Sequence, residues 1–108
     1  MVERDVYLDN LFGSLADPIR RDILQRLISA QYTVSQLAEN YSVSLAAVAK
    51  HVNVLEKAKL VVKQRRGKEQ VVSIAPEALH DASRYLARYE ALWNTRFNAL
   101  DSILKEEL

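Results

Sequence analysis

One short basic segment contains the side chains of this 108-residue chain that are best suited to bind a polyanion. From Lys50 to Lys68 the sequence has seven Lys or Arg residues and a single acid, Glu56, an excess of six positive charges, although the whole chain has a net charge of only +1. Basic side chains that cluster in this way are typical of proteins that contact the phosphate groups of nucleic acids. The sequence therefore predicts that this segment faces a nucleic acid.

The same residue types give little support for catalysis. The chain has no cysteine, so it has no thiol nucleophile, no disulfide and no thiolate metal site. It also lacks a Gly-rich phosphate-binding loop and an acid and base at a recognisable spacing. We expect no catalytic residue, no metal site and no cofactor, and we expect that the protein is not an enzyme.

The sequence also predicts a cytoplasmic protein with no membrane partner. Its longest apolar runs are only a few residues, whereas a membrane-spanning helix needs about 20. Acidic residues (Glu3, Asp5 and Asp9) occupy the N-terminal segment, where a signal peptide would be apolar. The absence of cysteine is also typical of a reducing compartment.

Capping signals predict a helix-turn-helix between residues of about 33 and 59. Thr33 with Gln36 three residues later matches a capping box, and Ser44 is a good N-cap for the next helix. In such a motif the second helix lies in the major groove with its N-terminal residues at the base edges. The predicted recognition residues are Ser44, Leu45, Ala46, Ala49, Lys50 and Asn53. The predicted phosphate contacts are Thr33, Ser35 and Gln36. Capping alone is the alternative role for Thr33 and Ser44.

Residues of about 60–74 have the composition of a β-hairpin. Two β-branched apolar stretches flank the polar string QRRGKEQ, in which Gly67 can take a positive φ in the turn. The basic tip of this wing, Arg65, Arg66, Gly67 and Lys68, is predicted to contact the DNA backbone or the adjacent minor groove. The alternative is a solvated turn that happens to be rich in charge.

The last helix, predicted from about 76 to 107, has more apolar surface than a small domain can cover. Its apolar side chains are spaced by threes and fours. Pairing with the N-terminal helix and with the same helices of a second copy would bury them in a two-fold dimer. The predicted dimer-interface residues are Leu8, Leu11, Phe12, Trp93, Phe97, Leu100 and Leu104. The alternative is that the last helix folds over its own domain.

Four strings resemble the ArsR-type winged-helix repressors of bacteria and archaea: LADPIRRDIL, VSQLAENYSVS, AVAKHVNVLEKAKLV and RRGKEQVVSI. The resemblance covers residues 8–104. It implies one domain over residues 1–108, mainly α with a small β-hairpin, a winged helix-turn-helix with long N- and C-terminal dimerisation helices. It also implies a homodimer that represses by binding a pseudo-palindromic double-stranded DNA operator, often with release by an effector.

The chain differs from the metal-sensing members of the family at the positions of their metal ligands. The arsenic sensors have cysteines where this chain has Thr33 and Ser35, and the last helix offers only His80 beside Asp81 instead of paired metal ligands. The chain is therefore similar to the small autorepressors that lack sensor residues. Whether a small-molecule effector exists stays open.

The predicted recognition helix is poor in polar side chains. Leu45, Ala46 and Ala49 replace polar residues that are usual in the family, so they can contact thymine methyl groups but cannot distinguish guanine by hydrogen bonding. We expect readout of A·T-containing steps, with polar contacts from Lys50 and Asn53. One alternative is that Leu45 and Ala46 pack against the turn. Another is that the domain is a protein–protein interaction module with weak or no specific DNA binding.

Three other conspicuous side chains are predicted to be structural. Arg20 and Arg21 near the start of the second helix are expected to pair with carboxylates such as Asp17 or Asp22. His51 is expected to be a helix-packing residue that bonds to a nearby backbone or phosphate group, not a metal ligand.

Overall fold

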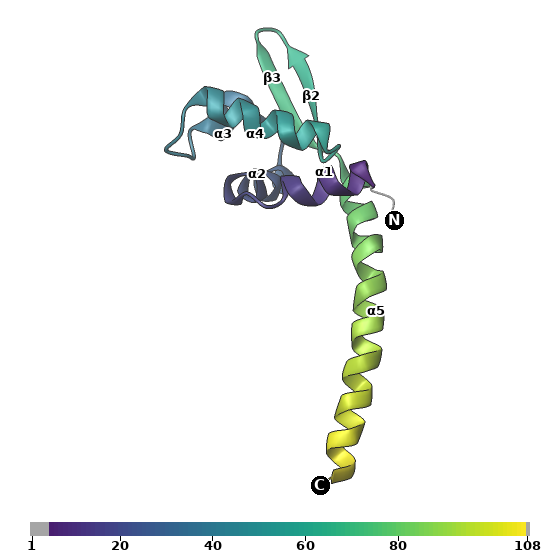
Figure 1. The fold of residues 1–108 in the computed structure, drawn as a ribbon. Coiled ribbons are helices and arrows are strands. Elements are labelled where there is room, and N and C mark those ends of the chain that lie inside the picture. Colours follow the sequence, from purple (N-terminus) through teal and green to yellow (C-terminus); the bar gives the residue numbers. More distant parts are fainter. Residues whose placement is uncertain (1–4, 108) are drawn as a thin grey trace.

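A computed structural model describes residues 5–107 of the chain, and its side chains as far as residue 105. Its elements, in order, are α1 (Val6–Ser14), α2 (Pro18–Ser29), β1 (Tyr32–Thr33), α3 (Val34–Ala38), α4 (Leu45–Lys57), β2 (Val61–Arg66), β3 (Glu69–Ile74) and α5 (Pro76–Glu107). Figure 1 shows helices α1 to α4 gathered at the base of the β2–β3 hairpin, while α5 extends away from them. The predicted mainly helical winged helix-turn-helix is confirmed.

Local capping interactions begin three of these helices, and those of α3 and α4 are at the predicted residues. The Asp17 carboxylate accepts hydrogen bonds from the backbone N–H groups of Ile19 and Arg20, with Pro18 in the first turn of α2. Thr33 and Gln36 form both bonds of the capping box, and the Ser44 hydroxyl accepts from the backbone N–H of residue 47. Each cap satisfies N–H groups that have no partner inside the helix.

The sheet has three strands, although the sequence predicted only the hairpin. Its order is β1-β3-β2, all antiparallel. Strand β1 pairs Tyr32 with Val72 and Thr33 with Val71, so it covers the edge of β3 that the wing leaves open. A two-residue strand is too short to show alternation in the sequence, which is why it was missed.

The hydrophobic core lies between α2, α3, α4 and the base of the sheet. Side chains on the inner face of α4, at Val48, Val52 and Leu55, are fully buried. Leu11 of α1 is also fully buried in this core, so its predicted place in a dimer interface needs correction: its own chain already covers it. Helix α1 has only nine residues in the structure, which corrects the prediction of a long N-terminal helix.

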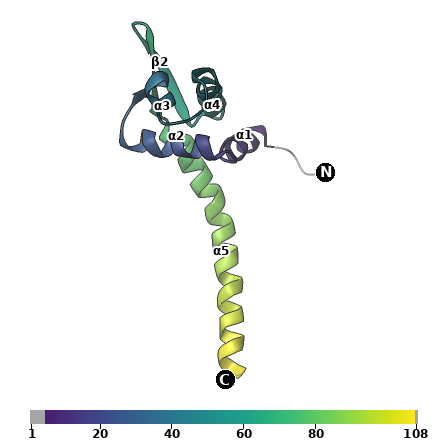
Figure 2. The same cartoon turned by 90° about the vertical axis from the view of Figure 1, so that its left-hand side faces the viewer.

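Helix α5 is supported by the domain only near its beginning. Ala78 and Ala82 are buried, and the ring of Tyr85 lies 5.7 Å from that of Phe12. From Leu86 to Leu104 the large apolar side chains are 53% to 70% exposed, and Figures 1 and 2 show the helix projecting from the body in both views. The alternative that it folds over its own domain is therefore wrong.

The overall dimensions agree with this projection. The radius of gyration is 18.9 Å, against about 13 Å for a compact chain of this length. A 32-residue helix is about 48 Å long at about 1.5 Å per residue, which accounts for most of the 67 Å long axis. Among the described residues, no helix is long and apolar enough to cross a membrane.

Candidate nucleic-acid interface

The outer face of α4 is open to solvent. Leu45 is 54% exposed, and Ala46, Lys50 and Asn53 are also exposed, whereas Ala49 is half-buried. The exposed parts of Leu45 and Ala46 are therefore accessible to a ligand. The structure therefore brings the predicted recognition residues together on one side of α4.

The predicted phosphate contacts on α3 are partly occupied by the capping box. The Thr33 hydroxyl accepts from the Gln36 backbone N–H at 3.1 Å, and the Gln36 side-chain oxygen accepts from the Thr33 backbone N–H at 2.8 Å. Ser35 and Gln36 are nevertheless exposed, so the Ser35 hydroxyl and the Gln36 amide nitrogen are available to a ligand. Asn40, which sequence reasoning missed, donates to the Gln36 and Leu37 carbonyl oxygens at 3.2 and 3.3 Å.

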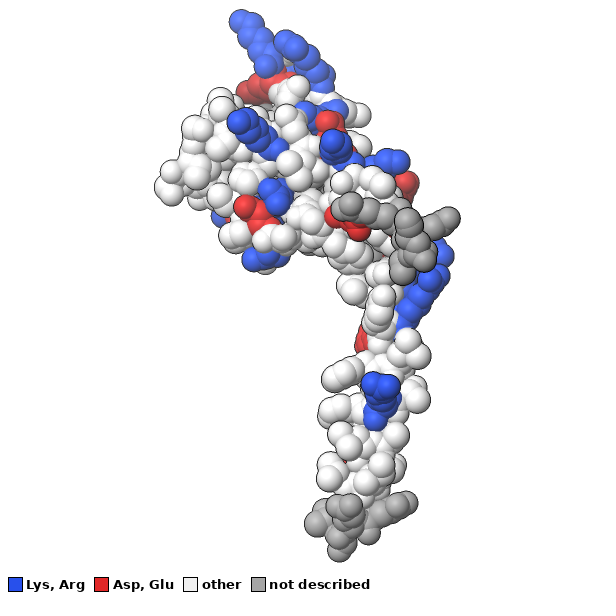
Figure 3. All heavy atoms as spheres, viewed as in Figure 1, with Lys and Arg blue, Asp and Glu red and all other residues white. Residues whose placement is uncertain are grey.

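The wing carries its basic residues at an exposed tip. Gly67 has φ of 64°, and the Nε of Arg65 donates to the Gly67 carbonyl oxygen at 3.3 Å. Arg65, Arg66 and Lys68 are exposed, and Figure 3 shows Lys and Arg atoms gathered at the end of the hairpin. A cationic projection beside an exposed helix is the arrangement that winged-helix proteins use on DNA phosphates.

A lysine that was not predicted connects the wing to α4. The Lys63 ammonium of β2 donates to Oδ1 of Asn53 and lies 3.5 Å from Oε1 of Glu56. The Lys63 side chain is only 18% exposed. Ten residues separate Lys63 from Asn53, so no local pattern indicated the contact.

Arg20 joins the end of α1 to α4. Its Nε donates to the Ser14 carbonyl oxygen at 2.6 Å, and its Nη1 lies 3.2 Å from Nδ1 of His51. Arg21 donates to the Leu15 carbonyl oxygen at 2.8 Å. The structural role predicted for both arginines is confirmed, but the predicted carboxylate partners are wrong. The last carbonyls of a helix have no partner inside it, and these arginines satisfy them.

His51 is a helix-packing residue, as predicted, but its partner is a side chain. A guanidinium has no acceptor, so Nδ1 of His51 accepts the hydrogen bond from Arg20. The bond fixes α4 against α2 one residue after Lys50. The orientation of the exposed side of α4 therefore depends on the Arg20–His51 bond, which lies outside that side.

A second polar contact fixes α2 to the turn between α3 and α4. The Tyr41 hydroxyl donates to Oδ2 of Asp22 at 2.5 Å, and Arg26 pairs with the same carboxylate at 2.8 Å. These hydrogen bonds lower the pKa of Asp22 below its ordinary value. Burial, together with the bond to Asp22, raises the pKa of Tyr41 to about 12.

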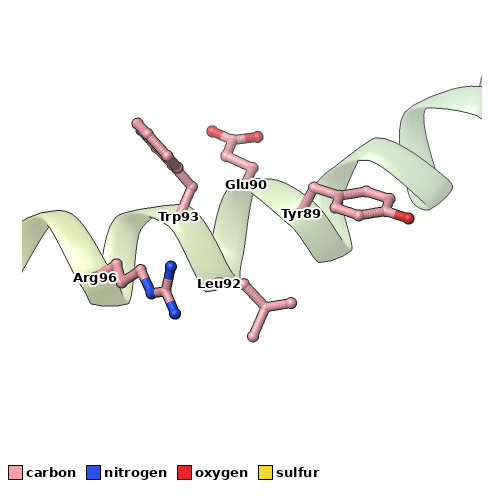
Figure 4. Close-up of a pocket in the computed structure, with 5 residues that line it drawn as sticks. All are labelled: Tyr89, Glu90, Leu92, Trp93 and Arg96. Carbon is pink, nitrogen blue, oxygen red and sulfur yellow. The ribbon is translucent and has the colours of Figure 1, made fainter.

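The described residues contain no group of three or more His, Cys, Asp or Glu side chains placed to hold a metal ion. His80 is exposed, and Asp81 accepts a hydrogen bond from the Tyr7 hydroxyl at 2.9 Å. Shallow hollows do occur along α5. Figure 4 shows that the residues around one of them, including Trp93 and Arg96, spread along a single helix, so within the described chain the hollow has no opposing wall.

Comparison with known proteins places the chain among regulators. A family model described as a helix-turn-helix domain matches residues 15–64. A solved structure named as an ArsR family transcriptional regulator is 31% identical, with a TM-score of 0.79, over 87% of this chain and 97% of that chain. The chain belongs to the ArsR family. An ArsR-like transcriptional regulator from Rhodococcus sp. RHA1 is similarly close, with 33% identity and a TM-score of 0.77 over 93% of this chain and 92% of that chain.

Two curated proteins that are similar to this chain are named as regulators. The transcriptional repressor SdpR of Bacillus subtilis is 27% identical over 82 residues, 76% of this chain and 91% of SdpR. The HTH-type transcriptional regulator Rv2034 of Mycobacterium tuberculosis is 37% identical over 71 residues, 66% of each chain. The ArsR resemblance inferred from the four sequence strings is thus confirmed.

Proposed function

We propose that this ArsR-family protein is a sequence-specific transcriptional repressor that binds a pseudo-palindromic double-stranded DNA operator as a homodimer in the cytoplasm. Membership of the family makes the protein a DNA-binding transcriptional regulator. The observation that carries the finer proposal is the outer face of α4, where Leu45, Ala46, Lys50 and Asn53 are exposed together beside the basic wing.

The base contacts follow from the chemistry of that face. Leu45 and Ala46 offer methyl groups near the N-terminus of α4, where recognition helices contact base edges. Such groups contact the thymine C5-methyl and supply no donor to guanine. We therefore expect A·T pairs at the operator positions beside these two residues.

Phosphate contacts would position the helix without reading sequence. The proposed contacts are the Ser35 hydroxyl, the Gln36 amide nitrogen and the Arg65, Arg66 and Lys68 side chains of the wing. Each cation that neutralises a phosphate steepens the fall of log affinity with log salt by about 0.9. The wing thus accounts for much of the expected salt dependence.

The apolar side of α5 is the proposed dimer interface. Trp93, Phe97, Leu100 and Leu104 are 53% to 66% exposed. A second copy would bury these side chains. Two-fold symmetry would place the recognition helices about 34 Å apart, one turn of DNA. Leu8 and Phe12 of α1, both half-buried, are proposed to flank the interface.

Binding to the DNA upstream of the protein's own gene tests the proposal. Fluorescence anisotropy at two salt concentrations would compare this fragment with a shuffled fragment of equal composition. We expect at least a thousandfold preference for the native fragment. Replacing both Arg65 and Arg66 by Ala should weaken both fragments and reduce the salt slope by about 2. Lys105→Ala, at the far end of α5, serves as the matched loss of a cation and should leave the slope unchanged.

One observation favours a second candidate function. Val43, Leu45, Val54 and Val62 are 38% to 54% exposed around α4 and β2, and an apolar surface of this kind also suits protein association. The second function is a protein–protein interaction module with weak or no specific DNA binding. Equal and weak binding to both fragments would favour it over repression.

A further inference from the structure

The register of the β2–β3 hairpin determines the direction in which the Lys63 side chain projects. Lys63 lies opposite Val72 in the β2–β3 ladder, and cross-strand partners share one face of a sheet. Val72 is fully buried against the core, so Lys63 projects on the side that α4 covers. There its ammonium donates to Oδ1 of Asn53 and pairs with Glu56, which keeps Lys63 on the protein surface instead of free for a phosphate.

This contact determines which end of the Asn53 amide faces outward. A carboxamide has an acceptor oxygen and a donor NH₂ group, whereas an ammonium has donors only. The atom that faces Lys63 must therefore be the oxygen. The planar amide then turns its two N–H groups away from Lys63. Asn53 is exposed, and its amide nitrogen has no partner within the described chain.

We infer that Lys63 is a specificity-determining positioning residue: it holds Asn53 so that the major groove meets N–H donors, which select guanine over adenine at one operator position. The inference rests on the proposed function. A free asparagine pairs with adenine through one donor and one acceptor, at N7 and N6. With its oxygen turned towards Lys63, Asn53 presents no acceptor beside its donors to the groove. Guanine offers two acceptors, N7 and O6, which match the donors.

The guanine position is separate from the A·T positions expected beside Leu45 and Ala46. Asn53 lies about two helical turns further along α4. Leu45 and Ala46 act by contact with methyl groups, whereas Asn53 acts by donated hydrogen bonds. One helix thus supplies two kinds of readout, and the second kind depends on a residue of the wing that does not itself touch a base.

Competition binding with operators that carry single base-pair changes tests the inference. Asn53→Ala should abolish the preference at one position and so identify it. There the wild-type protein should favour guanine over adenine by about tenfold. Lys63→Met frees the amide, so the ratio should fall to near one or reverse. Lys68→Met removes a matched charge from the wing and should weaken all operators alike, with the ratio unchanged. The same ratio in Lys63→Met and wild type would overturn the inference.

A second measurement does not depend on DNA. The side-chain NH₂ signals of Asn53 in a ¹⁵N correlation spectrum are identified by their loss in Asn53→Ala. They should shift in Lys63→Met and stay in place in Lys68→Met. Unchanged signals would show that Lys63 does not hold the amide. Shifted signals with an unchanged base ratio would overturn the specificity role alone, and a wild-type protein without any base preference would overturn the proposed function as well.

Discussion

Truncation of Trp93 tests the proposed dimer most directly. Trp93 is 66% exposed and makes no ring contact within the described chain. A buried aromatic side chain covers about 150–250 Å², so roughly 100–160 Å² of Trp93 is left for a partner to cover. At about 25 cal/mol per Å² this area is worth roughly 2.5–4 kcal/mol per chain before the costs of association. After those costs we expect about 2 kcal/mol per chain, and thus about 4 kcal/mol for a two-fold dimer.

The expected result of Trp93→Ala is a dimer that dissociates roughly a thousandfold more readily, since about 1.4 kcal/mol corresponds to a factor of ten. Sedimentation across a wide range of concentration measures this change. Thr95→Ala is the matched control, because Thr95 lies on another side of α5 and its hydroxyl donates to the Ala91 carbonyl oxygen of the same helix. Its dissociation constant should equal that of the wild type.

The emission of Trp93 supplies an independent readout, because it is the only tryptophan in the chain. In the wild-type protein its emission should shift to longer wavelength on dilution, as the side chain becomes exposed to water. Helical circular dichroism should fall at the same concentrations, since the unsupported end of α5 is only marginally stable alone. A wild-type protein that is monomeric at every concentration, or a Trp93→Ala dimer as tight as the wild type, would refute the reasoning.

Three further predictions concern stability. Tyr41→Phe should lower the free energy of unfolding at neutral pH by about 1–2 kcal/mol, because it removes the bond to Asp22. Because the pKa of Tyr41 is raised, the stabilisation by its hydroxyl is fully present below pH 10 and is lost as pH rises towards 12. In that window the free energy of urea unfolding should therefore depend less on pH for Tyr41→Phe than for the wild type. Lys59→Gly should raise stability by about 1 kcal/mol, because Lys59 has φ of 63° at the end of α4, a conformation that favours glycine; an unchanged midpoint of thermal unfolding would contradict this. Arg20→Met should cost about 2 kcal/mol and leave Nδ1 of His51 without its donor, which would change the ¹⁵N chemical shifts of the imidazole; the same imidazole shifts in both proteins would argue against the Arg20 contact.

The sequence by itself determined the elements whose causes are local. Asp17, Thr33 with Gln36, and Ser44 each bond to N–H groups no more than three residues away, so the starts of α2, α3 and α4 were predictable. The hairpin turn at Gly67 is equally local. Apolar periodicity also predicted the apolar stripe of α5, because the stripe depends only on the repeat of a helix. DNA contacts at the site residues stay a prediction.

Only the tertiary structure decided the contacts between distant residues. Strand β1 exists because Tyr32 reaches Val72, forty residues later, and the Arg20–His51 bond spans 31 residues. Lys63 meets Asn53 because the register of the hairpin aims it at α4. Each of these contacts depends on how several elements pack against one another. The residue pattern within a single element therefore cannot predict it. The same holds for α5. Its apolar stripe was visible in the sequence, but only the packing of α1 to α4 and the sheet shows that these elements leave the stripe uncovered.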